Sequence, residues 1–302
     1  REMNLRPGLA ALALALVVGS APGHAQQAGA WPTKPVAIVM GGNDDFEISL
    51  YKDKLAEVYG KPFILDHKPG GTYVIAGSYV AKAQPDGHVL LQTSTSFLVA
   101  PAFNDNLPFD ILKDFAPVSL LSNVPVYLQA NVNFPANNMR EYIAYAKANP
   151  GKVLWGTSGA GGIQHLAGEW MHDLIGSPAT FIHYKNGTAA TNDLAAGRIH
   201  VQPRPVAGTM GFIKASKLKL LGVVGPKRDR FAPDLPSAGE AGLKDLDQPN
   251  FTGLVGPAKM DRVLVNRLSA ELNRIVFLPE IREKMEPLGN TQIGSTPEEF
   301  GK

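Results

Sequence analysis

Short apolar runs rich in β-branched residues alternate with amphipathic segments along most of the chain. The apolar runs predict strands, and apolar positions spaced three and four residues apart predict helices. The first series reads strand, helix, strand, helix and strand, followed by a long strand-rich segment interrupted at Pro125: 36–40, 46–59, 62–66, 74–83, 88–93 and 116–131. This alternation predicts an α/β protein with parallel sheets.

A second series continues the alternation, with strands at 153–157, 180–184, 199–202 and 218–224 and helices at 139–148, 164–175 and 189–196. After a strand at 251–255, helices are predicted at 262–277 and 280–288. A last helix start carries Thr296 as a cap, Pro297 at the first position and Glu299 in a capping box. The sequence ends at Lys302, so we expect the natural protein to continue further.

The N-terminus has the three parts of a secretory signal peptide. Arg1 and Arg6 form a basic start, residues 9–18 form an apolar core, and small residues follow. We expect cleavage after Ala25. The apolar run is shorter than the roughly 20 residues that a spanning helix needs, which argues against a membrane anchor. The predicted location is therefore the periplasm.

Residues 26–302 are enough for one large domain or two smaller ones, and two are favoured. Without Arg1, Glu2 and Arg6 the chain carries 27 basic and 26 acidic residues, which argues against a nucleic-acid partner. A hydrophobic content of 44% is typical of a folded globular protein. The sequence has no cysteine, so its stability depends on core packing.

Four loops that follow predicted strands are rich in Gly, Ser and Thr: 41–45, 93–96, 156–162 and 185–188. Several lead directly into helices, where free backbone N–H groups and the helix dipole favour an anion such as a carboxylate. Any one of these loops is explained by turns and helix caps alone. Their recurrence at equivalent places favours a ligand site.

Other chemistries fit the sequence less well. The glycines at 159–162 lack the spacing of a dinucleotide loop, so no cofactor is predicted. Ser158, followed by Asp193 and His200, has the order of a serine hydrolase, but Ala160 breaks the nucleophile motif. A secreted hydrolase using Ser158 stays the less favoured alternative, and the chain is predicted not to be an enzyme.

The histidines at 165, 172, 183 and 200 lack the close paired spacing of zinc sites, so no metal is predicted. His165 lies near a helix start, where contact with a ligand and packing against the local backbone are equally favoured. His172 is expected at the surface.

Many short motifs follow one another in the order found in the Bug family, the substrate-binding receptors of tripartite tricarboxylate transporters. Each motif is weak by itself, and their number and order make the resemblance specific. It extends over essentially all of the chain after the signal peptide. The motifs are WPTKP at 31–35, KPG at 68–70, AKAQPDG at 81–87, KDFAPV at 113–118, ANPGK at 148–152, GTSG at 156–159, HLAGE at 165–169, HYK at 183–185 and AGEAGL at 238–243.

The resemblance implies a periplasmic binding protein fold of type II, in which two α/β lobes, each a mainly parallel sheet flanked by helices, are joined by crossing strands. Lobe 1 is expected to comprise residues 26–127 and 250–302, and lobe 2 residues 128–249. A small carboxylate would bind between the lobes and pass to the membrane subunits of the transporter. The chain is expected to act as a monomer.

The resemblance also assigns ligand-binding residues. The matching positions are Gly41, Gly42, Asp45, Thr93, Ser94 and Ser96 in lobe 1 and Thr157, Ser158, Gly159, His165, Tyr184, Lys185 and Gly187 in lobe 2.

Three positions depart from the family pattern. The first loop is shortened, because Met40 runs directly into Gly41, and Thr72 and Tyr73 replace a common glycine pair. Arg204 stands where the family carries an Asp. If Arg204 faces the cleft it is able to bind a carboxylate through two hydrogen bonds, whereas Pro203 and Pro205 are equally able to turn it to solvent.

The favoured function is a periplasmic receptor that closes over a small organic acid and delivers it to a tripartite tricarboxylate transporter. A receptor that presents its ligand to a membrane sensor kinase is the alternative. The sequence does not identify the acid.

Overall fold

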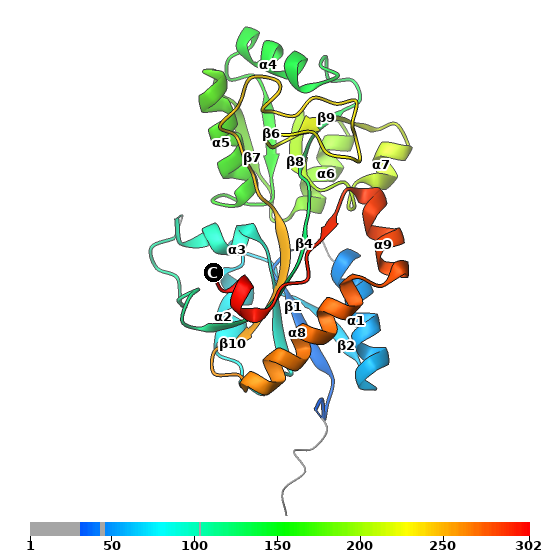
Figure 1. Cartoon of the computed structure of the whole chain (residues 1–302). Helices are drawn as coiled ribbons and strands as arrows, with labels where there is room; N and C mark the ends of the chain where they lie inside the picture. Colours follow the sequence, from blue (N-terminus) through cyan, green and yellow to red (C-terminus); the bar gives the residue numbers. More distant parts are fainter. Residues whose placement is uncertain (1–30, 43–45, 103) are drawn as a thin grey trace, which may run out of the picture.

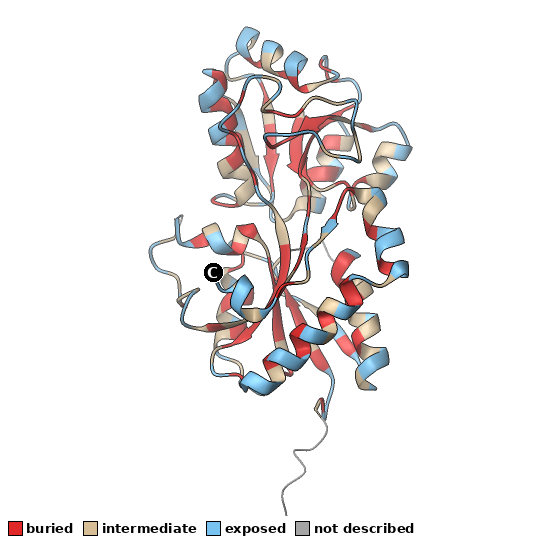
Figure 2. Ribbon diagram, in the orientation of Figure 1, coloured by how far each residue is buried: buried red, intermediate tan, exposed pale blue. Residues whose placement is uncertain are grey.

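The computed structural model describes residues 31–42, 46–102 and 104–302. The predicted signal peptide and Asp45 lie outside the described residues. The chain forms two bodies, one above the other in Figure 1, each built on its own sheet. Buried residues concentrate in the strands and on the inner sides of the surrounding helices (Figure 2).

The first sheet has the strand order β11-β4-β10-β3-β1-β2. Its strands are β1 (Val36–Met40), β2 (Phe63–His67), β3 (Val89–Thr93), β4 (Phe115–Asn123), β10 (Phe251–Pro257) and β11 (Thr291–Gln292). The helices of this body are α1 (Phe46–Tyr59), α2 (Val74–Ala81), α3 (Thr95–Val99), α8 (Arg262–Val276), α9 (Pro279–Met285) and α10 (Pro297–Phe300), with 3-10 turns at Ala100–Ala102 and Glu286–Leu288.

The second sheet has the order β7-β6-β8-β5-β9. Its strands are β5 (Tyr127–Asn131), β6 (Leu154–Thr157), β7 (Thr180–His183), β8 (Val201–Arg204) and β9 (Leu218–Val223). Four helices accompany it: α4 (Met139–Ala148), α5 (Ile163–Ile175), α6 (Gly187–Ala195) and α7 (Met210–Lys214). The chain crosses between the two sheets twice, from β4 to β5 through residues 124–126 and from β9 back to β10 through residues 224–250.

Both sheets are mixed, so the expectation of mainly parallel sheets is wrong in this detail. β1 pairs in parallel with β2 and β3, because α1 and α2 provide the crossovers that parallel strands require. The crossing strands run the other way: β10 is antiparallel to both β3 and β4, and β5 is antiparallel to both β8 and β9. A chain that leaves one sheet and returns to it brings these strands back in the opposite direction.

Helix α8 illustrates how the pattern of apolar residues produces packing. Asp261 caps the helix, since its side chain accepts hydrogen bonds from the N–H groups of Val263 and Leu264. Leu268, Leu272 and Ile275 recur at helical spacing and are fully buried in the core of the first body. Burial of one such side chain contributes about 1.5–3 kcal/mol, so this stripe fixes the helix against the sheet.

His172 is buried, and the expectation that it lies at the surface is wrong. It sits in α5 on the side that faces α4, and only 3% of it is exposed. Its Nδ1 lies 2.7 Å from the Ser177 carbonyl and its Nε2 lies 2.7 Å from the Tyr142 hydroxyl. A neutral ring satisfies both partners by donating to the carbonyl and accepting from the hydroxyl. Burial lowers the pKa of His172.

We expect His172 to make the protein less stable in acid. In the unfolded chain His172 takes up a proton near its ordinary pKa of about 6.5, and the folded state resists this uptake. Stability is therefore complete above about pH 6.5 and falls as the pH decreases, by up to about 1.4 kcal/mol per pH unit. Between pH 7.5 and pH 5, the Tm of the wild type should decrease more steeply than the Tm of His172→Gln. An equal decrease in Tm for the two proteins would contradict this assignment.

Candidate functional site

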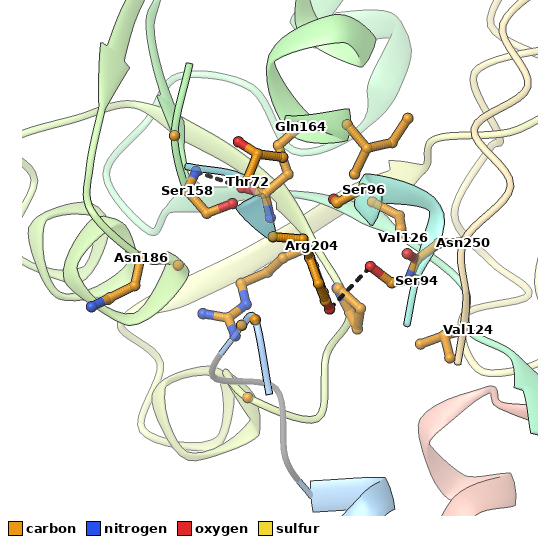
Figure 3. Close-up of a pocket in the computed structure, with 18 of the residues that line it drawn as sticks. Thr72, Ser94, Ser96, Val124, Val126, Ser158, Gln164, Asn186, Arg204 and Asn250 are labelled. Atoms are coloured by element: carbon orange, nitrogen blue, oxygen red, sulfur yellow. Dashed lines mark hydrogen bonds between the residues drawn. The ribbon is translucent and has the colours of Figure 1, made fainter. Parts of the chain in front are cut away.

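A cavity of about 410 Å³ lies between the two sheets. Loops from both sheets line it, together with Val124 and Val126 of the first crossing segment, Gln248 and Asn250 of the second, and Phe251 and Thr252 at the start of β10 (Figure 3). These loops follow the carboxyl ends of β1, β3, β6 and β7, which is where α/β sheets bind ligands. The site is thus shared between the two bodies.

Tyr73 lines the cavity on the side of the first sheet. It has a left-handed backbone, with φ of 72°, and its ring lies against Gly41 so closely that a Cβ on Gly41 would be 2.3 Å from the ring. The Tyr73 hydroxyl donates to Gln92 Oε1 at 2.8 Å and accepts from Ser94 Oγ at 3.2 Å. The ring therefore occupies the space beside the first loop, and any side chain at position 41 would force Tyr73 to shift.

The loop after β6 forms part of the opposite wall. Its geometry is held by Gln164, whose Oε1 accepts a hydrogen bond from the Ser158 N–H at 2.9 Å. Trp155 in β6 donates its ring N–H to the Gln164 carbonyl at 3.1 Å, so the buried indole supports the same residue from below. The Ser158 hydroxyl lies at the cavity surface, as Figure 3 shows.

The loop after β7 leads into α6, which begins at the cavity. Asn186 caps this helix by accepting from the Ala189 N–H at 2.9 Å. Tyr184 donates to Asp193 at 2.8 Å, and partial burial together with this carboxylate raises the pKa of Tyr184 to about 12. Tyr184 is therefore a neutral hydroxyl at physiological pH. With Lys185 it gives this wall a hydrogen-bonding group and a positive charge.

Arg204, at the end of β8, faces the cavity (Figure 3). Only 3% of the residue is exposed, so the neighbouring prolines do not turn it to solvent. Its Nη1 donates to Thr191 Oγ1 at 2.7 Å, and Thr191 in turn bonds Gln202 at 2.9 Å. This network holds the positive charge of Arg204 at the cavity wall. The low dielectric constant there makes its attraction for an anion stronger than in water.

The two walls touch directly at Thr72. Its Oγ1 donates to the Ala160 carbonyl at 3.3 Å, which joins the segment before α2 to the glycine-rich loop after β6. Thr72 also has a left-handed backbone, with φ of 50°. The contact closes one side of the cavity.

Ten of the predicted site residues line the cavity: Gly41, Gly42, Ser94, Ser96, Ser158, Gly159, Tyr184, Lys185, Gly187 and Arg204. The fold brings them together from five separate segments that belong to both sheets. Their contact with a ligand stays a prediction. Asp45 lies outside the described residues.

Thr93, Thr157 and His165 do not line the cavity. Thr93 ends β3 in the sheet interior and is 1% exposed. Thr157 is buried beneath the loop, where its hydroxyl bonds the Gly159 carbonyl at 3.1 Å and lies 2.8 Å from His183 Nδ1. His165 accepts from the Gly161 N–H at 3.1 Å and lies 3.3 Å from Glu169, so it supports the loop from behind. Neighbouring residues of a strand or helix turn point in different directions, and these three point away from the cavity.

Sequence reasoning missed several lining residues, namely Glu47, Gln92, Asn186, Gln248, Asn250, Thr252 and Asn290. Gln248, Asn250 and Asn290 come from the second crossing segment or from near the end of the chain, and tertiary packing alone brings them to the site. Glu47 had a signal. It stands four residues before Tyr51 on the buried side of α1, where a charged residue is unusual.

The serine hydrolase alternative is not supported by the geometry. Asp193 accepts from Tyr184 and from Arg198 Nη1 at 2.7 Å, and His200 Nδ1 accepts from the Leu154 N–H at 3.1 Å. Neither residue is directed at Ser158. Among residues 31–302, apart from 43–45 and 103, no group of three His, Cys, Asp or Glu side chains is placed to hold a metal.

No helix in the described part of the chain is long and apolar enough to cross a membrane.

Comparisons with known proteins agree with this architecture. Residues 49–294 match the family described as the tripartite tricarboxylate transporter family receptor, TctC. A UPF0065 protein from the tcbD-tcbE intergenic region of Pseudomonas sp. is 30% identical, over 98% of this chain and 89% of its own length.

Three solved structures are similar to the chain. One described as a periplasmic transporter has a TM-score of 0.86 at 30% identity, over 90% of this chain and 93% of its own. The periplasmic binding protein BugD has a TM-score of 0.84 at 28% identity, with the same coverage. R. palustris Rpa4515 with adipate has a TM-score of 0.82 at 26% identity, over 89% and 92% of the two chains. These similarities confirm the predicted resemblance and fold: the chain belongs to the Bug or TctC family of tripartite tricarboxylate transporter receptors, which are solute-binding proteins and not enzymes.

Proposed function

We propose that this protein captures a small organic acid in the cavity between its two sheets and delivers it to the membrane subunits of a tripartite tricarboxylate transporter. The main observation in support of this function is the buried guanidinium of Arg204 at the cavity wall. A guanidinium in a site of low dielectric binds a carboxylate through two parallel hydrogen bonds.

Other groups of the cavity support the same ligand class. Lys185 supplies a second positive charge, and Ser94, Ser96 and Ser158 supply hydroxyl donors. Helix α6 begins at Gly187 in the cavity lining, and the first N–H groups of a helix have no acceptor within it. Adipate, the acid held by the similar R. palustris protein, is of a size that such a cavity accommodates.

The compartment follows from the relatives and the N-terminal sequence. The similar structures are described as periplasmic, and residues 1–25 have the composition of a signal peptide. We infer that the mature protein begins after Ala25 and works in the periplasm.

Ligand capture would proceed by closure of two lobes, residues 26–127 with 250–302 and residues 128–249. Groups that line the cavity belong to both, so an acid between them contacts both at once and stabilises the closed form. The crossing segments at 124–126 and 224–250 are the places where bending would occur. A permease that recognises the closed form would then receive only loaded receptor.

A thermal-shift screen tests this function. Succinate, glutarate, adipate, malate and citrate are compared with the uncharged diamides of the same chain lengths. A true ligand at about 100 times its Kd adds roughly 2.7 kcal/mol of stability, which raises Tm by about 5–10 °C for a chain of this size. We expect at least one acid to give this shift and the matched diamide to give none. Equal shifts with acid and diamide, or no shift with any acid, would contradict the proposal.

A further inference from the structure

Glu47 is a carboxyl group in the lining of the cavity. It is in the first turn of α1, and only 6% of the residue is exposed. Its Oε1 accepts a hydrogen bond from the Tyr51 hydroxyl at 2.7 Å. The hydroxyls of Ser122 on β4 and Thr252 on β10 also favour its ionised form.

The charge of Glu47 has no cationic partner in the described part of the chain. Among the described residues, the groups that act on its pKa are neutral hydroxyls from three elements. Burial outweighs these hydroxyls and raises the pKa of Glu47. An ionised carboxylate at this place is therefore costly until a positive charge comes close to it.

The charges of the cavity are separated between its two walls. Glu47 belongs to α1, which follows β1 of the first sheet. Lys185 and Arg204 belong to the second sheet, after β7 and at the end of β8. A cavity that is negative on one wall and positive on the other is complementary to a ligand that carries both charges at its two ends.

Building on the proposed function, we propose that Glu47 forms a subsite for a cationic nitrogen of the ligand, so that the receptor takes an organic acid that also carries an ammonium group. The carboxylate of the ligand lies toward Arg204 and Lys185, and its ammonium group lies toward Glu47. Such a ligand supplies the missing counter-charge of Glu47 and connects the two walls.

Isothermal titration calorimetry with matched probes tests this subsite. The first pair is 4-aminobutanoate and glutarate, which have the same methylene spacer and differ only in one end group. The second pair is 5-aminopentanoate and adipate. We expect the wild type to bind the amino acid of at least one pair about ten-fold or more tightly than the diacid, since the diacid places a second negative charge beside Glu47.

Glu47→Gln removes the charge and keeps the shape of the side chain. We expect it to weaken amino-acid binding roughly 30-fold or more and to abolish the preference over the diacid. Glu57→Gln is the matched control on the same helix, because the Glu57 side chain is 63% exposed and pairs with Lys54 outside the cavity. This control should bind both probes like the wild type.

The outcomes separate the two proposals. Diacid binding without amino-acid binding, or unchanged amino-acid affinity in Glu47→Gln, overturns the ammonium subsite and leaves the organic-acid receptor standing. Absence of binding by both members of both pairs counts against the subsite, and the wider acid screen then decides the function. If Glu47→Gln fails to fold, the preference of the wild type and the behaviour of Glu47→Asp decide the question.

Discussion

Replacing Arg204 by Ala is expected to weaken binding of the ligand acid roughly 30-fold or more. Loss of one partner of a desolvated charge pair typically costs 2–5 kcal/mol, because the other charge stays buried without compensation. Arg204 is 3% exposed and lines the cavity. The substitution therefore leaves the carboxylate of the ligand buried without its cationic partner. Titration calorimetry of the variant with the best acid from the thermal screen measures the effect.

Two further variants make the Arg204 result specific. Arg204→Lys keeps the charge but loses the planar fork, so it should recover only part of the affinity. Arg198→Ala removes an arginine whose side chain is 71% exposed and which pairs with Asp193, and it should bind like the wild type. Equal affinity of Arg204→Ala and the wild type would exclude Arg204 as the carboxylate anchor.

Replacing Trp155 by Ala is expected to lower the free energy of unfolding by about 3–5 kcal/mol, which is the largest effect on stability that we predict. The indole is fully buried, packs edge-on against Phe181 and His172, and donates to the Gln164 carbonyl. Its removal leaves a cavity beneath α5 and releases the residue that holds the Ser158 loop. Urea unfolding of the ligand-free protein measures the loss.

Trp170→Ala is the matched control, since Trp170 is a tryptophan of the same body, on helix α5 instead of in β6, and is 38% exposed. We expect it to cost less than half as much as Trp155→Ala. Similar losses for the two variants would contradict the assignment of Trp155 as the support of the second core.

Local signals in the sequence predicted most elements of the fold. The capping box at Thr296 and Glu299 is present, with the Thr296 hydroxyl accepting from the Glu299 N–H and the Glu299 carboxylate accepting from the Thr296 N–H. The predicted helices at 46–59 and 139–148 have the predicted ends. The break at Pro125 separates β4 from β5, as a proline without an N–H donor requires.

Features that depend on tertiary packing escaped prediction. The short helices α3 and α7 have too few residues to show a period. The predicted helix at 280–288 divides into α9 and a 3-10 turn, because Pro287 cannot donate the next helical hydrogen bond. His172 was misplaced since its polar atoms find partners, Tyr142 and Ser177, that only the folded chain brings near.

The sequence predicted which loops form the candidate site, but it did not predict where the charged side chains of the site lie. Glycine- and serine-rich loops after strands gave the walls, because carboxyl ends of parallel strands meet at one edge. The direction of Arg204 depends on the packing around β8, and the burial of Glu47 depends on the packing of α1 against β4 and β10. No local pattern specifies either arrangement. These two residues are the ones on which the choice of ligand depends.

A crystal structure of the protein with its best-stabilising acid tests the central claim most directly. We expect the acid inside the cavity between the two sheets, with a carboxylate within hydrogen-bonding distance of the Arg204 guanidinium and contacts to loops of both walls. An acid bound outside this cavity, or a cavity without acid at saturating concentration, would contradict it.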